Sequence, residues 1–95
     1  MNEDKKAELC IKMATQLPVL RKAMGASQTR FAELTGLTRS TVVRMERNKN
    51  MSWNTFLSVL MILSKHEETV TLLHSYHLYS DELEEYLSGK KEREA

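Results

Sequence analysis

The sequence contains few residues that form cross-links or that interrupt helices and strands. Among its 95 residues there are one cysteine (Cys10), one proline (Pro18) and three glycines. A lone cysteine cannot form an internal disulfide, so the fold must rest on apolar packing, and a reducing cytoplasm is the expected compartment. No apolar run approaches the roughly 18 uninterrupted residues of a membrane-spanning helix. The charged start, residues 1–6, lacks the apolar stretch of a signal peptide. We therefore expect a cytoplasmic protein that does not enter a membrane.

The charge of the chain is divided unevenly along its length, although the formal net charge is only +1. Residues 20–50 carry seven basic and two acidic side chains, a balance of +5. Residues 64–95 carry four basic and eight acidic side chains, a balance of −4. Opposite charge at the two ends gives the molecule a polar field, and a basic block is a candidate site for a polyanion.

The first part of the chain has the apolar spacing of a helix. Leu9, Met13, Leu17 and Leu20 recur at intervals of three or four residues, and the pattern runs on toward Gly25. Because a proline inside a helix removes a hydrogen bond, Pro18 predicts either a kink or the start of a new helix. Gly25 is expected to end that helix.

Four polar residues mark the starts of the later helices, because their side chains can accept a hydrogen bond from a free backbone N–H. These N-caps, with the helices they predict, are Ser27 (28–35), Thr38 (39–47), Ser52 (53–65) and Ser80 (the last, acidic helix). Gly36 suits the positive φ of a sharp turn between the first two of these helices. A further amphipathic segment follows His66. The pattern predicts an all-α bundle of about five to six short helices.

The segment Gln28–Arg47 holds the pattern of two short helices that cross at a steep angle. Ala32 permits close approach, Gly36 makes the turn, and Leu37, Val42 and Met45 form a shared core. This segment, with flanking residues from about 17 to 64, resembles the helix-turn-helix regulators of the Cro and phage-repressor type, the Xre family. Two departures are an unusual polar Thr35 and the lack of the usual glycine in the turn after Arg47.

The resemblance implies a lambda-repressor-like fold that binds double-stranded DNA. It assigns phosphate contact to Gln28, base reading to Arg39, Ser40 and Arg44, and backbone or flanking contacts to Thr38, Thr41, Asn48 and Lys49. Arginine can bond guanine O6 and N7 together, which agrees with this assignment. For an isolated arginine, an exposed surface charge paired with Glu33 or Glu46 is the competing interpretation.

We expect residues 1–66 to form the DNA-binding domain and residues 67–95 a helical extension that packs on it or dimerises. One recognition helix reads few base pairs, so a homodimer on a palindromic operator is expected. The helix 53–65 is apolar almost all round, which makes Val59 and Ile62, together with the face formed by Leu72, Leu73 and Tyr76, the candidate dimer surface.

The predicted function is therefore sequence-specific DNA binding by a transcriptional regulator, and a repressor is the first interpretation. One alternative is an antitoxin-like protein that binds a toxin and represses its own operon; another is a protein-interaction module that has lost DNA binding. His74 and His77 lie three apart, but no cysteine or carboxylate completes a metal pattern. We find no nucleophile–base pair, phosphate-cradling glycine loop or carboxylate dyad, and so expect neither catalysis nor a cofactor.

Overall fold

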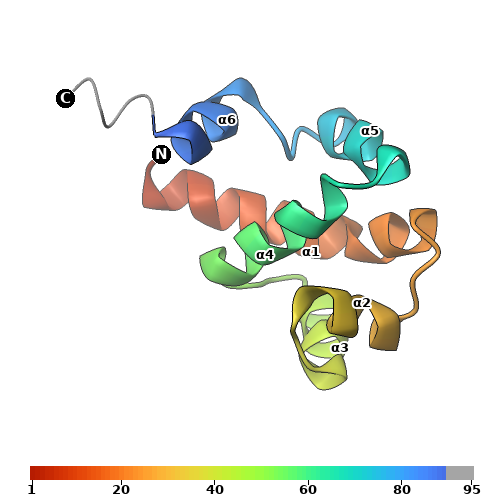
Figure 1. Cartoon of the computed structure of the whole chain (residues 1–95). Helices are drawn as coiled ribbons and strands as arrows, with labels where there is room; N and C mark the ends of the chain where they lie inside the picture. Colours follow the sequence, from red (N-terminus) through yellow and green to blue (C-terminus); the bar gives the residue numbers. More distant parts are fainter. Residues whose placement is uncertain (90–95) are drawn as a thin grey trace.

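A computed structural model describes residues 1–89 of the chain, which form six α-helices and no strands (Figure 1). In chain order the helices are α1 (Glu3–Ala23), α2 (Gln28–Thr35), α3 (Arg39–Asn48), α4 (Trp53–Leu63), α5 (Glu67–Ser75) and α6 (Asp81–Ser88). The long α1 crosses the middle of the molecule, and α2 with α3 lies on one side of it (Figure 1). The all-α prediction is confirmed. No helix within the described range is long and apolar enough to cross a membrane.

Helix α1 runs through Pro18 without ending, so the alternative of a new helix at this residue is wrong. Leu17 and Leu20, on either side of the proline, are both fully buried. Apolar packing of both halves of the helix on one core outweighs the cost of the proline, about 3 kcal/mol in a helix interior. The helix ends as expected, because Gly25 adopts a φ of +71° and its N–H donates to the carbonyl of Lys22 at 3.0 Å.

All four predicted N-caps are confirmed. Ser27, Thr38, Ser52 and Ser80 each accept a hydrogen bond from the backbone N–H three residues later. The helix after Ser52 ends at Leu63, two residues earlier than expected. The hydroxyl of the buried Thr69 donates to the carbonyls of Leu63 and His66, and this contact fixes the entry into α5 in place of a side-chain cap.

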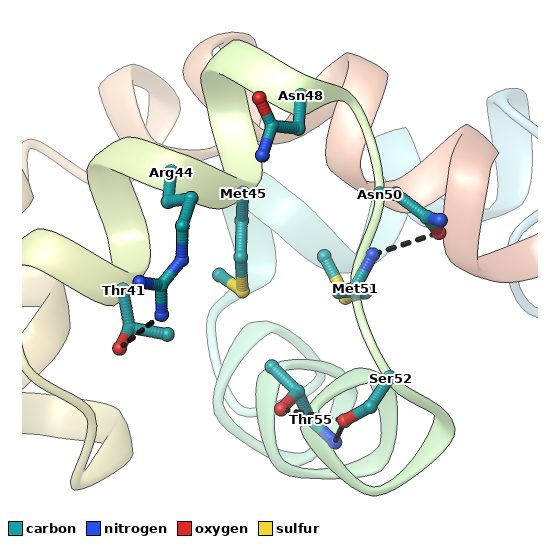
Figure 2. A pocket seen from close by; sticks show the side chains of 8 residues that line it. All are labelled: Thr41, Arg44, Met45, Asn48, Asn50, Met51, Ser52 and Thr55. Carbon is teal, nitrogen blue, oxygen red and sulfur yellow. Dashed lines mark hydrogen bonds between the residues drawn. The ribbon is translucent and has the colours of Figure 1, made fainter.

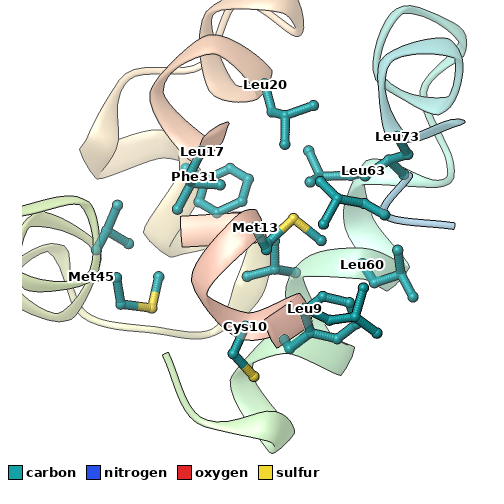
Figure 3. Packing of buried hydrophobic residues seen from close by; sticks show 14 of the residues in the cluster. Leu9, Cys10, Met13, Leu17, Leu20, Phe31, Met45, Leu60, Leu63 and Leu73 are labelled. Carbon is teal, nitrogen blue, oxygen red and sulfur yellow. The ribbon is translucent and has the colours of Figure 1, made fainter. Parts of the chain in front are cut away.

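The apolar core is one cluster to which every helix contributes, and Figure 3 shows its members from α1 to α5. Leu17 of α1, Phe31 of α2 and Phe56 of α4 have no exposed surface, and neither has Leu73 of α5 nor Leu83 of α6. Because the segment after residue 66 supplies buried leucines to the same cluster, α5 and α6 pack on their own chain. The domain boundary at residue 66 stays a prediction.

Two residues expected on a dimer surface lie instead in this core. Val59 and Leu73 are fully buried, so their assignment to an exposed interface is wrong. Ile62, Leu72 and Tyr76 are partly buried against the cluster. The physical reason is that α1 and α5 both pack on α4 and bury a large part of its surface. The periodicity of α4 alone could not indicate how many helices would cover it.

Candidate nucleic-acid interface

The turn between α2 and α3 is tight because Gly36 can adopt a left-handed conformation. Its φ is +76°, and the next residue, Leu37, donates its N–H to the carbonyl of Ala32 at 3.0 Å. A Cβ at Gly36 would meet no atom within 4 Å, so only the backbone conformation favours glycine here. The unusual Thr35 donates its hydroxyl to the carbonyl of Phe31 at 2.8 Å, which satisfies the polar group at this half-buried position.

A buried ion pair ties α3 to α1. The guanidinium of Arg21 donates to both carboxylate oxygens of Glu46, at 2.8 and 3.1 Å, and also to the carbonyl of Ala26 at 3.1 Å. The two side chains are only 12% and 9% exposed. A bidentate pair of this kind fixes orientation as well as distance. It therefore holds α3 at a set angle to α1 and to the start of α2.

Gln28, at the start of α2, joins the same network. Its side-chain amide donates to Glu46 at 3.0 Å, which bridges the starting turn of α2 to α3. The phosphate contact expected for Gln28 stays a prediction. In the structure its side chain positions the two helices relative to each other.

The outer face of α3 carries the residues expected to read bases. Arg39, Ser40 and Arg44 are exposed, whereas Val42 and Met45, on the opposite side of the helix, are buried. Arg39 and Arg44 are five residues apart and project about 140° from each other around the helix. The orientation of α3 thus separates a core side from a side that is free to enter a groove of DNA.

Sequence reasoning missed Arg47 as a member of this face. It is exposed in the last turn of α3 and lies seven residues after Ser40 and three after Arg44, so all three share one stripe of the helix. Its spacing was the signal that could have identified it.

Threonine hydroxyls border the base-reading face. The hydroxyl of Thr38 caps α3 by accepting from the N–H of Thr41 at 3.1 Å, and the two hydroxyl oxygens lie 2.8 Å apart. Arg44 lies 3.5 Å from the Thr41 hydroxyl, a distance at the limit of a hydrogen bond. Its guanidinium is therefore held only weakly and is free to reorient toward a ligand.

An open groove of about 550 Å³ runs between α3 and the start of α4 (Figure 2). It brings together Thr41, Arg44 and Asn48 from α3 with residues that the sequence argument did not assign to DNA binding. These additional polar residues are Asn50, Ser52 and Thr55. Met45 and Met51 also line the groove, and its polar side chains with one arginine suit a phosphate backbone that passes beside the recognition helix.

Lys49 occupies the turn after α3, where the family usually has glycine. Its φ is +55°, so this lysine adopts the left-handed conformation that normally favours glycine. A non-glycine residue in this region costs roughly 1–2 kcal/mol. The loop therefore keeps the shape that a glycine would give, but it carries an exposed positive charge at the cost of backbone strain.

The cations of this surface are not neutralised by nearby carboxylates. Glu46 is engaged by Arg21, and Glu33 pairs with Arg30 at 3.2 Å. These are the two acidic residues of the basic segment. Across residues 1–89, the structure shows no ion pair for the exposed cations of α3 and its loop, which are Arg39, Arg44, Arg47 and Lys49. Pairing of Glu33 or Glu46 with the recognition-helix arginines is therefore wrong, whereas the choice between a base contact and a plain exposed charge stays a prediction.

The acidic segment lies far from this surface. Helix α6 carries Asp81, Glu82 and Glu84 in its first turn, and it lies on the opposite side of α1 from α3 in Figure 1. The last residues of the acidic segment, 90–95, are outside the described range. The fold thus places opposite charges at opposite ends, and an approaching polyanion meets the α3 end.

Two other polar features carry no site. Cys10 is buried in the apolar core, and this burial raises the pKa of its thiol. The side chain therefore acts as a small neutral apolar group. The ring of His74 lies 5.5 Å from that of Tyr79, and no cluster of three metal-binding side chains occurs in the part of the chain that the structure describes.

Comparison with known proteins agrees with this geometry. A family model described as helix-turn-helix matches residues 20–52, from the last part of α1 to the N-cap of α4. No curated protein and no solved structure matched the chain significantly. The matched stretch contains the buried ion pair, the glycine turn and the whole of α3. Residues 20–52 thus match a helix-turn-helix, which supports the resemblance to regulators of the Cro and phage-repressor type.

Proposed function

We propose that this chain is a sequence-specific regulator of transcription, a repressor that binds double-stranded DNA as a homodimer in the cytoplasm. The single observation that carries the proposal is the set of exposed cations on α3 and its loop, which is left free because both acidic residues of the basic segment are engaged elsewhere. A helix-turn-helix with such a face is suited to insertion into the major groove.

In this mechanism Arg39 and Arg44 of α3 read bases, whereas Lys49 in the following loop contacts the phosphate backbone. Arg39 and Arg44 donate pairs of hydrogen bonds to guanine O6 and N7, and Ser40 contributes a less selective contact. Lys49 neutralises a phosphate, which adds affinity without sequence preference. Repression then follows from occupancy of the operator, since the bound protein excludes other proteins from the same DNA.

Selection of bound duplexes from random DNA, followed by titration at several salt concentrations, tests the proposal. With about four to six phosphate contacts per dimer, log Kd should change with log salt with a slope of about 4 to 5. If no selected duplex binds even at low salt, the proposal is wrong.

Substitutions within the surface separate reading from attraction. Arg44→Lys keeps the charge but loses the planar fork, so it should lower preference for particular base pairs and leave the salt dependence unchanged. Lys49→Ala should weaken binding to all sequences alike and reduce the salt slope by about 1. Lys65→Ala, which removes one exposed charge outside the surface, is the matched control. Equal losses on operator and random DNA for Arg44→Lys would refute its base-reading role.

A further inference from the structure

A second surface lies between α4 and α6, away from the residues proposed to bind DNA. It is an apolar groove of about 350 Å³, lined by Leu57, Leu60, Met61, Ser64, Tyr79 and Leu87. Met61 is 60% exposed and Leu87 is 45% exposed. Large apolar side chains that are gathered around a groove at this exposure mark a surface that a partner covers.

The α4 side of this surface has no charge. Residues 50–64 contain no charged side chain, whereas 28% of all residues in the chain are charged. On the exposed flank of α4, Asn54, Ser58 and Met61 follow each other at intervals of four and three residues. Depletion of charge is typical of the centre of a protein interface and not of a solvated helix face.

The other wall of the groove, α6, contacts the rest of the chain through a few side chains. Leu83 of α6 is fully buried in the core, and the ring of Tyr86 lies edge-on to Trp53 at 5.8 Å. The ammonium of Lys6, from α1, lies 5.3 Å from the centre of the Tyr86 ring. Side chains of α1 and α4 therefore contact α6, and the groove lies between α4 and α6 of the folded chain.

We propose that the occupant of this groove is a second copy of the chain, related by a two-fold axis that places Met61 of each copy in the groove of the other. This inference rests on the proposed function, which requires two recognition helices. A protruding Met61 beside a concave apolar groove is self-complementary, as a two-fold interface must be. The flexible methionine side chain can adapt to an apolar groove.

Charge decides where the two-fold axis lies and which kind of partner fits. An uncharged face meets its own copy without burying an unpaired charge, whereas a partner with a charged face would lose hydration without compensation. Asp81, Glu84 and Glu85 lie together in a separate hollow of α6, and like charges across an interface repel. The axis therefore lies nearer to α4 than to α6.

The position of the surface agrees with such a dimer, but a stable interface needs more area than the groove provides. A stable interface of standard size covers about 800 Å² per partner, which is about one seventh of the 5861 Å² accessible surface of the chain. It must therefore extend beyond the groove along the uncharged flank of α4. The groove is lined by the C-terminal half of α4 and by α6, and α6 lies across α1 from α3 (Figure 1), so contact centred on the groove is away from the recognition helices.

Sedimentation velocity on the full-length protein tests the proposal with a matched pair of variants. Met61→Glu puts a charge into the interface twice per dimer and should raise the dimer dissociation constant at least about a hundredfold. Val19→Glu makes the same kind of change at an apolar residue of α1 that is 47% exposed, and it should change the constant less than about threefold. Circular dichroism checks that both variants are folded.

A second measurement does not depend on loss of association. In a Met61→Cys variant, a short thiol cross-linker should join two chains, because the two-fold axis brings the two positions together. The unsubstituted protein is the control, because its single cysteine, Cys10, is buried and should give little cross-linking. The proposal is overturned by an unsubstituted protein that stays monomeric at high micromolar concentration, by a Met61→Glu variant that dimerises normally, or by a Met61-dependent complex with another protein in place of the dimer. The last outcome favours the antitoxin-like alternative.

The DNA assay separates failure of the interface from failure of the proposed function. A monomeric Met61→Glu variant should still bind a half-site, weakly and with strong salt dependence, which supports both proposals together. A protein that dimerises through Met61 but binds no selected DNA would support the interface and contradict the DNA-binding role.

Discussion

The buried pair of Arg21 and Glu46 gives the sharpest prediction about stability. Glu46→Ala removes two charge-assisted hydrogen bonds from a guanidinium that is 12% exposed, and Gln28 loses its acceptor. Removing one partner of a buried ion pair typically costs about 3–5 kcal/mol, because the other charge is left desolvated and unpaired. The free energy of unfolding of a small domain is only about 5–15 kcal/mol. We therefore expect Glu46→Ala to remove a large share of the stability of the chain and to lower Tm by more than about 12 °C.

Urea denaturation followed by circular dichroism measures this loss, and the chain supplies its own control. Arg30 and Glu33 form an ion pair whose side chains are both 61% exposed, and Glu33→Ala should cost less than about 1 kcal/mol. A double variant, Arg21→Met with Glu46→Leu, should recover much of the loss, since it leaves no unpaired charge in the core. The reasoning is refuted if Glu46→Ala and Glu33→Ala destabilise the chain equally, or if the double variant is less stable than Glu46→Ala.

Three further substitutions test local features of the fold. Lys49→Gly should raise the free energy of unfolding by up to about 1 kcal/mol, because it relieves the left-handed strain, while it weakens DNA binding; urea titration and DNA titration must then shift in opposite directions, and a parallel shift contradicts the assignment. Gly36→Ala should cost about 1–2 kcal/mol through backbone conformation alone, and Gly36→Asn less, since asparagine tolerates this region; equal costs in thermal melts would argue against strain as the cause. Leu83→Ala should cost about 2–5 kcal/mol, and it should change the fluorescence of Trp53 by loosening α6; an unchanged emission would show that Tyr86 holds α6 without it.

The sequence by itself determined the local elements and the family of the central motif. Each N-cap could be read from a serine or threonine placed before a helical pattern, since capping involves only a side chain and a backbone N–H three residues away. Gly36 was recognisable for the same reason, because the left-handed turn is a property of one residue. The exposed positions of α3 followed from the periodicity of a single helix, which also would have included Arg47.

Tertiary structure decided everything that depends on residues far apart in the chain. Arg21 and Glu46 are 25 residues apart, so no local pattern links them, and their pairing is what frees the recognition-helix cations from Glu46. The continuity of α1 through Pro18 and the burial of Val59 and Leu73 depend on how many neighbours cover each helix, because packing energy summed over several partners outweighs the preference of any single residue. The hydrophobicity of α4 indicated surplus apolar surface, but only the docking of α6 determined that this surface is a groove beside Met61.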